Sequence, residues 1–174
     1  MSILFLALGA TAAGFLLILL IGRGQPFSPA APENAPRQDP ADLAWVRTLG
    51  VEGFHRLLVR LFAEMGFVPE HSEPGRETVD FCAVDPTPIR GGRIYVHGVF
   101  ARAAGLAVGA DDVRALVDAA RAEFAGKAVL VTLGRFSNEA CDAARENPID
   151  LVDGDELAAL MKRHLPQAWA TRTL

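Results

Sequence analysis

The stretch "KAVLVTL" at residues 127–133 constrains the fold of this chain more than any other feature. A strand that shows one face to water alternates apolar and polar residues, whereas this one is almost continuously apolar. Such a run is typical of a strand in a sheet that is covered on both faces. It therefore predicts a central strand with helices packed on each side.

The segments around that strand alternate between helical and extended patterns. Apolar residues from Phe54 to Met65 recur at the spacing of a core-facing helix, which is expected to end at Gly66. Two strands joined by a turn are predicted at residues 78–84 and 93–100. They are followed by a helix at 113–124, a strand at 127–133, a helix at 138–147, a strand at 149–152 and a helix at 156–165. Ser137 and Asp153 are expected to cap the last two helices. This α/β order predicts a three-layer α/β/α sandwich around a mixed sheet.

The N-terminal residues Ile3 to Gly22 contain no charged side chain. About twenty helical residues span the hydrocarbon core of a bilayer, so residues 1–22 are predicted to form one transmembrane helix. A cleaved signal peptide is the alternative, but no basic region lies between Met1 and the apolar run, and no small-residue cleavage site follows closely. Arg23 lies directly after the apolar run. The positive-inside rule then predicts a single-pass membrane protein with a cytoplasmic body.

Residues 23–41 are rich in proline and lack apolar periodicity, which indicates an extended linker that reaches roughly 55 Å at most. The folded domain is expected at residues 42–166, followed by a tail at 167–174. Because residues 1–22 carry no charge, the net charge of -4 belongs to the linker and the domain. A mildly acidic domain lacks the basic footprint of general nucleic-acid binding, although it can still carry a local basic patch.

Asp80 is a carboxylate inside the otherwise apolar strand "TVDFCAV". Burial without a partner would cost such a group several kcal/mol, so Asp80 marks either a functional site or a paired structural charge. Arg90, Arg93 or a histidine would serve as the partner. The histidines show no metal-binding spacing, no serine or cysteine has the context of a nucleophile, and no glycine-rich phosphate motif follows a strand.

Four segments of the sequence, taken together, form a pattern that none of them shows alone. "GFHRLLVRLFAEMGF", "ETVDFCAV", "RIYVHGVF" and "VLVTLGRFSNEACDAARENPIDLVDGDELAALM" resemble, in order and approximate spacing, the Mrr-type restriction endonuclease domain. The resemblance covers about residues 49–165. It implies the restriction-endonuclease-like fold, DNA as a partner, and phosphodiester hydrolysis that depends on Mg²⁺ or Mn²⁺.

The resemblance also assigns positions to a catalytic site. The family places an aspartate on one strand, an amide or acidic residue and then a lysine on the next strand, and often a glutamate on the first helix. Asp80 matches the strand aspartate and is the one expected metal ligand. His55 stands where the helix glutamate is usual, His97 where the amide or acidic residue is usual, and Val99 where the lysine is usual. The resemblance therefore implies a remnant site of Asp80, His97 and His55.

Two further considerations bear on whether such a site could cut DNA. The only lysines of the chain, Lys127 and Lys162, fall in other predicted elements, so neither replaces the missing one. Imidazole suits manganese or zinc better than magnesium, which leaves a rearranged active site as an alternative.

Arg135 and Ser137 come just before the predicted helix at residues 138–147. The N-terminus of a helix attracts anions, so this pair is a candidate for binding a DNA phosphate. The alternative is that Ser137 is only a helix cap.

Three functions are therefore open. The first is a membrane-tethered module that binds DNA without hydrolysis, which predicts a basic patch around Arg135 and the Asp80 face. The second is an active endonuclease with a rearranged site, which predicts that Asp80, His55 and His97 converge within metal-ligand distance. The third is a scaffold for protein interaction, which predicts an exposed apolar patch.

Overall fold

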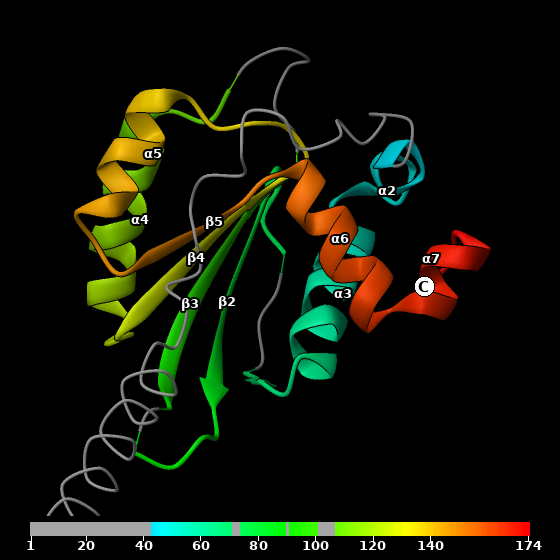
Figure 1. The fold of residues 1–174 in the computed structure, drawn as a ribbon, viewed down its shortest axis with the longest axis horizontal. Helices are drawn as coiled ribbons and strands as arrows, with labels where there is room; N and C mark the ends of the chain where they lie inside the picture. Colours follow the sequence, from blue (N-terminus) through cyan, green and yellow to red (C-terminus); the bar gives the residue numbers. More distant parts are fainter. Residues whose placement is uncertain (1–42, 71–73, 90, 101–106) are drawn as a thin grey trace, which may run out of the picture. The chain divides into compact units, whose positions relative to one another are not determined.

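A five-stranded mixed sheet forms the centre of the computed structural model, which describes residues 43–70, 74–89, 91–100 and 107–174. Its strands are β1 (Val68–Pro69), β2 (Thr78–Asp85), β3 (Gly92–Val99), β4 (Lys127–Thr132) and β5 (Ile149–Val152). They lie in chain order across the sheet (Figure 1). The pairs β1–β2 and β2–β3 are antiparallel, whereas β3–β4 and β4–β5 are parallel. The predicted mixed sheet is confirmed.

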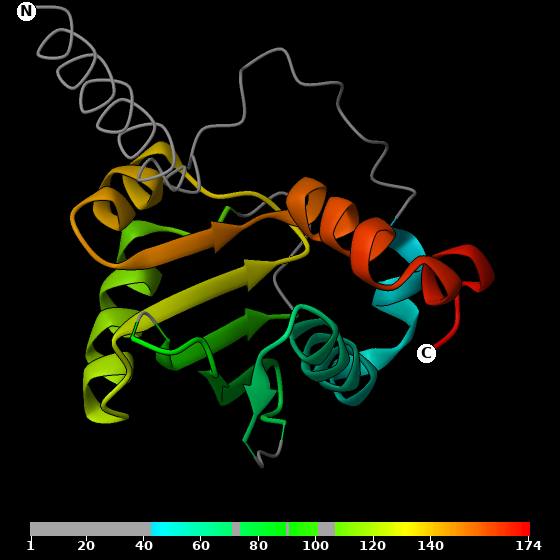
Figure 2. The same ribbon diagram turned by 60° about the horizontal axis from the view of Figure 1, so that its bottom comes forward.

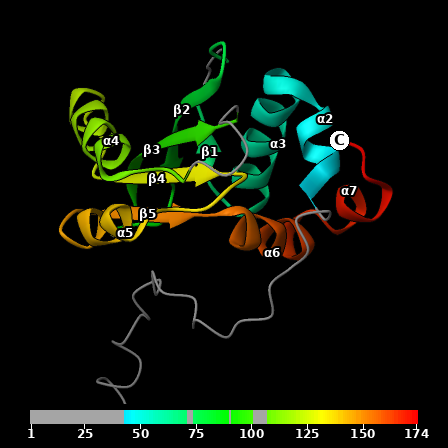
Figure 3. The same ribbon diagram turned by 90° about the horizontal axis from the view of Figure 1, so that it is seen from above.

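Helices cover both faces of this sheet. They are α2 (Ala44–Thr48), α3 (Gly50–Glu64), α4 (Ala110–Ala122), α5 (Asn138–Arg145), α6 (Gly154–His164) and α7 (Pro166–Thr171). Helices α3 and α6 pack with β2, β3 and β4 in one apolar core, and α4 and α5 pack against the opposite face in a second core. Figure 3 shows α4 and α5 on one side of the sheet and α3 and α6 on the other.

The central position of β4 explains its continuous apolar sequence. This strand lies between β3 and β5 (Figure 2), and every residue from Ala128 to Thr132 is buried. Val129 and Val131 belong to the core with α3 and α6, whereas Ala128 and Leu130 belong to the core with α4 and α5. The prediction of a strand covered on both faces is confirmed.

The predicted helix boundaries are set by the expected residues. Ser137 Oγ accepts a hydrogen bond from the Ala140 amide at 3.1 Å, and Asp153 Oδ1 accepts one from the Glu156 amide at 2.9 Å. Both N-caps are therefore confirmed. Gly66 follows α3 with φ of 95°, a left-handed conformation that glycine adopts without strain.

Three short elements go beyond the sequence prediction. These are α2, the two-residue strand β1, and α7, which occupies much of the segment expected to be a tail at residues 167–174. Pro166 is the first residue of α7, a position where its fixed φ and missing amide proton are tolerated. Ala168 is buried in the core, so this segment packs on the domain.

In the part of the chain that the structure describes, no helix combines the length and the apolar character needed to cross a bilayer. The predicted transmembrane helix at residues 1–22 and the predicted linker at residues 23–41 lie outside the described residues.

Candidate functional site

The register of two antiparallel strands brings Asp80 and His97 together. The two residues are direct partners across β2 and β3, so their side chains leave the sheet on the same face. His97 Nδ1 lies 2.5 Å from Asp80 Oδ1, and both side chains are partly exposed, at 24% and 39%. Among the partners expected for Asp80 from the sequence, the structure shows a histidine, His97.

Two hydroxyl groups complete the contacts of this carboxylate. Tyr95 donates a hydrogen bond to Asp80 Oδ1 at 2.8 Å, and Thr78 donates one to Oδ2 at 3.2 Å. Both carboxylate oxygens thus accept hydrogen bonds from the protein itself. The sequence did not identify Tyr95 or Thr78 as site residues, because the register between β2 and β3 was not known.

These contacts shift the pKa values of Asp80 and Tyr95 in opposite directions. Partial burial would raise the pKa of Asp80, but the hydrogen bond and charge of His97, with the bonds from Tyr95 and Thr78, outweigh it and lower the pKa. Burial, and then the hydrogen bond to Asp80, raise the pKa of Tyr95. An ionised carboxylate only accepts hydrogen bonds, so the proton between Asp80 and His97 resides on Nδ1 of the imidazole.

The position expected for a catalytic lysine is apolar and buried. Val99 has an exposed fraction of 8% and packs in the core with α4 and α5. Lys127 pairs in register with Ile94 rather than with His97, and its ammonium group contacts Asp150 at 2.5 Å. Lys162 lies on α6, with Nζ 4.7 Å from the centre of the Trp169 ring. Neither lysine stands beside Asp80, as the sequence predicted.

His55 does not join the pair. It lies on α3, and its ring meets Phe81 edge-on with the ring centres 6.3 Å apart. Phe81 neighbours Asp80 on β2 and therefore faces the opposite side of the sheet, in the core with α3. The convergence of Asp80, His97 and His55 that a rearranged nuclease site requires is not formed.

The residues present do not fit a divalent cation of the kind the family uses. Mg²⁺ and Mn²⁺ require several oxygen ligands, and Asp80 contributes the one carboxylate of the pair. Among the residues that the structure describes, no group of three or more histidine, cysteine, aspartate or glutamate side chains is arranged to hold a metal ion. The catalytic roles of Asp80, His97 and His55 stay predictions.

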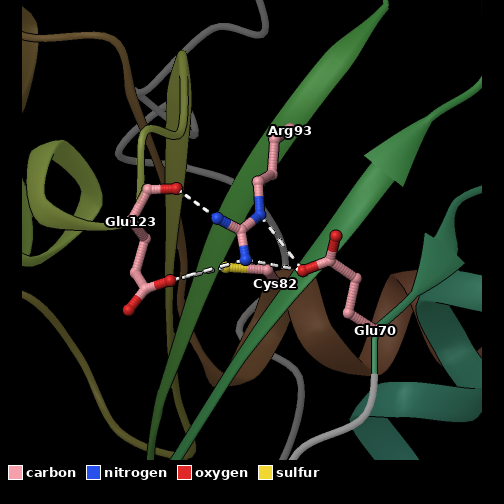
Figure 4. Close-up of polar contacts among 4 residues, drawn as sticks. All are labelled: Glu70, Cys82, Arg93 and Glu123. Atoms are coloured by element: carbon pink, nitrogen blue, oxygen red, sulfur yellow. Dashed lines mark hydrogen bonds and ion pairs between the residues drawn. The ribbon is translucent and has the colours of Figure 1, made fainter.

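A second polar cluster lies beside the first on β3 and is drawn in Figure 4. Arg93 Nη2 lies 2.7 Å from Glu70 and 3.4 Å from the Glu123 carboxylate, and Nη1 donates to the Glu123 carbonyl oxygen. Cys82 Sγ is 4.0 Å from Glu123, and burial raises the pKa of this thiol. The Arg93 side chain thus connects Glu70, the residue after β1, to Glu123 at the end of α4. Two glutamates around one arginine leave this region with an excess of negative charge.

The proposed phosphate-binding residues form a helix start. Ser137 is the N-cap of α5, and Glu139 in its first turn has a lowered pKa because of a backbone hydrogen bond and a bond with Ser137. Arg135 is exposed, and its carbonyl oxygen accepts a hydrogen bond from Val108. This geometry is that of a helix cap, and a role in phosphate binding stays a prediction.

Comparison with known proteins gives the family. The family model for the Mrr catalytic domain, described as "Restriction endonuclease", matches residues 46–161, about two thirds of the chain. No curated protein matches. The domain resembles the solved structure of the "DNA modification-dependent restriction endonuclease AspBHI", with a TM-score of 0.58 and 18% identity over 79% of this chain and 40% of that one.

A second solved structure is similar as well, the "MspJI Restriction Endonuclease in Complex with 27-mer Oligonucleotide". Its TM-score is 0.52, with 23% identity over 81% of this chain and 36% of that one. This chain therefore spans two fifths or less of the length of the two enzymes, and at these identities the likeness shows the fold. From the match of the family model, the chain belongs to the Mrr-type restriction endonuclease family.

Proposed function

We propose that this chain is a DNA-binding member of the restriction endonuclease family that does not hydrolyse DNA. The observation that carries the proposal is the state of Asp80, whose two carboxylate oxygens accept hydrogen bonds from His97, Tyr95 and Thr78. A second observation supports the proposal: two residues after His97, where the family places a lysine, this chain has the buried valine Val99.

The chemistry of hydrolysis explains why these features matter. Attack on a phosphodiester requires stabilisation of the negative charge that develops in the transition state, and in this family a divalent cation and a lysine supply it. A carboxylate already bound by three side chains of its own domain is a poor ligand for a hard cation, since it would have to give up those bonds. Asp80 and His97 therefore serve as a structural connection between β2 and β3.

DNA is the partner that the family favours. The two similar solved structures are of restriction endonucleases, and one is a complex with an oligonucleotide. Arg135 is exposed in the loop after β4, where its guanidinium group would contact a phosphate. The net charge of -4 requires that such contacts be local.

The binding proposal is tested with the full chain and a fluorescently labelled duplex, by anisotropy at low salt. We expect binding in EDTA, with no requirement for Mg²⁺, because the contacts are made by side chains. Arg135→Gln should weaken binding of all sequences alike. Absence of binding at low salt, or binding that appears only with Mg²⁺, would contradict the proposal.

We also propose that residues 1–22 hold the domain at a membrane, with the folded body in the cytoplasm. Support comes from the uncharged sequence between Ile3 and Gly22 and from Arg23 after it. Extraction of membranes with alkaline carbonate should leave the full chain in the pellet, whereas a variant that lacks residues 1–22 should be released. Digestion of the domain by protease added to intact cells would overturn the cytoplasmic orientation.

A further inference from the structure

The C-terminal residues that follow Glu156 carry an excess of positive charge on an acidic protein. Residues 157–174 contain Lys162, Arg163 and Arg172 together with His164, and no aspartate or glutamate. All three cations are exposed. The net charge of the whole chain, by contrast, is -4. Positive charge is therefore concentrated at the end of α6 and directly after α7.

An aromatic ring arranges two of these cations. Lys162 Nζ lies 4.7 Å and Arg172 Cζ lies 4.3 Å from the centre of the Trp169 ring, and Trp169 itself packs partly against the core. Arg172 has φ of 56°, in the left-handed region that an arginine rarely adopts, and it ends α7. The chain turns there with the guanidinium over the ring. Attraction between cation and ring holds both charges near one place.

The helix dipole accounts for only part of this pattern. Lys162, Arg163 and His164 stand in the last turn of α6, where a cation stabilises the helix end. Arg172 lies outside that turn, after α7, yet it adds to the same cluster through Trp169.

Three exposed arginines on α4 and α5 lie beside aspartates of the same helix. Each of three arginines on α4 and α5 forms an ion pair with the aspartate three residues before it: Arg114 with Asp111, Arg121 with Asp118, and Arg145 with Asp142. On the β2–β3 face, Arg93 lies between Glu70 and Glu123. A polyanion thus finds little net attraction at these places.

We infer that the α6–α7 end, defined by Lys162, Arg163, Trp169 and Arg172, binds the phosphate backbone of DNA. The inference rests on the proposed function and assigns part of the binding to a surface away from the Asp80–His97 pair. In the domain, α6 and α7 lie on the side of the sheet opposite to α4 and α5 (Figure 3). Contacts of this kind hold and orient a duplex without reading its sequence.

The test measures how DNA affinity changes with salt concentration for the full chain. A variant with Lys162→Gln, Arg163→Gln and Arg172→Gln should reduce the slope of log affinity against log salt by about 0.9 for each phosphate that is no longer neutralised. The matched control, Arg114→Gln with Arg121→Gln and Arg145→Gln, removes the same charge from α4 and α5. We expect the control to keep the slope of the unaltered chain.

Additional variants separate charge from folding. Arg163→Gln alone, which leaves the contacts of Trp169 intact, should reduce the slope by about 0.9. The paired variant Lys162→Arg with Arg172→Lys keeps both charges and should preserve the slope.

Each remaining outcome has a defined meaning. If the unaltered chain binds DNA and the triple variant has the same slope, the inference is overturned while the proposed function stands. If the unaltered chain binds no duplex at low salt, the proposed function falls and the inference falls with it.

Discussion

Asp80 has more polar partners than any other group of the candidate site. Its ionisation therefore makes the free energy of unfolding depend on pH. The contacts from His97, Tyr95 and Thr78 lower the pKa of Asp80 despite its partial burial. A carboxylate whose pKa is lower in the folded state stabilises the fold above its unfolded pKa, and the effect is lost as the pH falls through the folded value.

The variant Asp80→Asn should therefore lower the free energy of unfolding near neutral pH by about 1 to 2 kcal/mol, since it loses charge-assisted hydrogen bonds at a partly exposed position. The difference from the unaltered chain should shrink as the pH falls below about 4, where the unfolded carboxylate is protonated. Urea unfolding across this range measures both effects. Asp118→Asn on α4, an exposed residue, is the control, and an Asp80 effect no larger than that of the control would contradict the predicted role of these bonds.

Tyr95 gives a second prediction at the opposite end of the pH scale. Burial and the bond to Asp80 raise its pKa, so its stabilising contribution is complete below about pH 10 and decreases as the pH rises above that value. Tyr95→Phe should cost about 1 kcal/mol near neutral pH, and this difference should shrink in alkali. Because Tyr95 is the only tyrosine of the chain, phenolate absorbance follows its ionisation directly. Titration at the ordinary pKa of a free tyrosine would contradict the arrangement.

Of the four hydrogen-bonded residues Asp80, His97, Tyr95 and Thr78, the sequence predicted the first two as site residues. The strand position of Asp80 inside an apolar run and the resemblance to a family motif identified Asp80 and His97. Tyr95 and Thr78 required the pairing register, which arises from contacts between strands rather than from either strand alone. Motif spacing does not tell which face of the sheet a helix covers, so the contact of His55 with Phe81 could not be predicted, and the role of His55 stays a prediction.

At the scale of elements, long periodic segments were predictable and short ones were not. The stripe of α3 and the apolar run of β4 each carry enough repeats to define a period. Strand β1 has two residues and α7 has six, so neither shows a period of its own. Both form because neighbouring elements hold them: β1 pairs with β2, and Ala168 of α7 enters the core.

The close approach of α3 to β3 depends on Gly98. A Cβ atom at this position would lie 2.8 Å from Leu58 Cδ1 and 3.0 Å from Phe54 Cε1, inside van der Waals contact. Gly98→Ala should therefore destabilise the domain by about 1 to 3 kcal/mol, as overpacking of a core does. Thermal unfolding measures the change.

Gly92→Ala is the matched control on the same strand, because a Cβ atom at residue 92 meets nothing within 4 Å. Equal stability of the two alanine variants would show that α3 does not press on β3 in this way.

At the scale of the whole domain, the fold is that of the family, and the proposed loss of hydrolysis concerns the site alone. The mixed sheet, its two helical layers and the family match are those of a restriction endonuclease. Asp80 and His97 instead bond to each other, and Val99 is buried where a lysine is usual. Sequence order predicted the fold because burial periodicity and helix caps are local signals. The clustering of Lys162 and Arg172 around Trp169 was not predicted, because it depends on how α7 folds against α6.

The most direct measurement is incubation of the full chain with supercoiled plasmid in Mg²⁺, Mn²⁺ or Zn²⁺, with an Asp80→Ala variant treated identically. Retarded complexes and the form of the recovered plasmid are read from the same reactions. We predict that DNA is retained in complexes and recovered supercoiled with every metal. Nicking or linearisation by the unaltered chain that disappears in the Asp80→Ala variant would contradict this prediction.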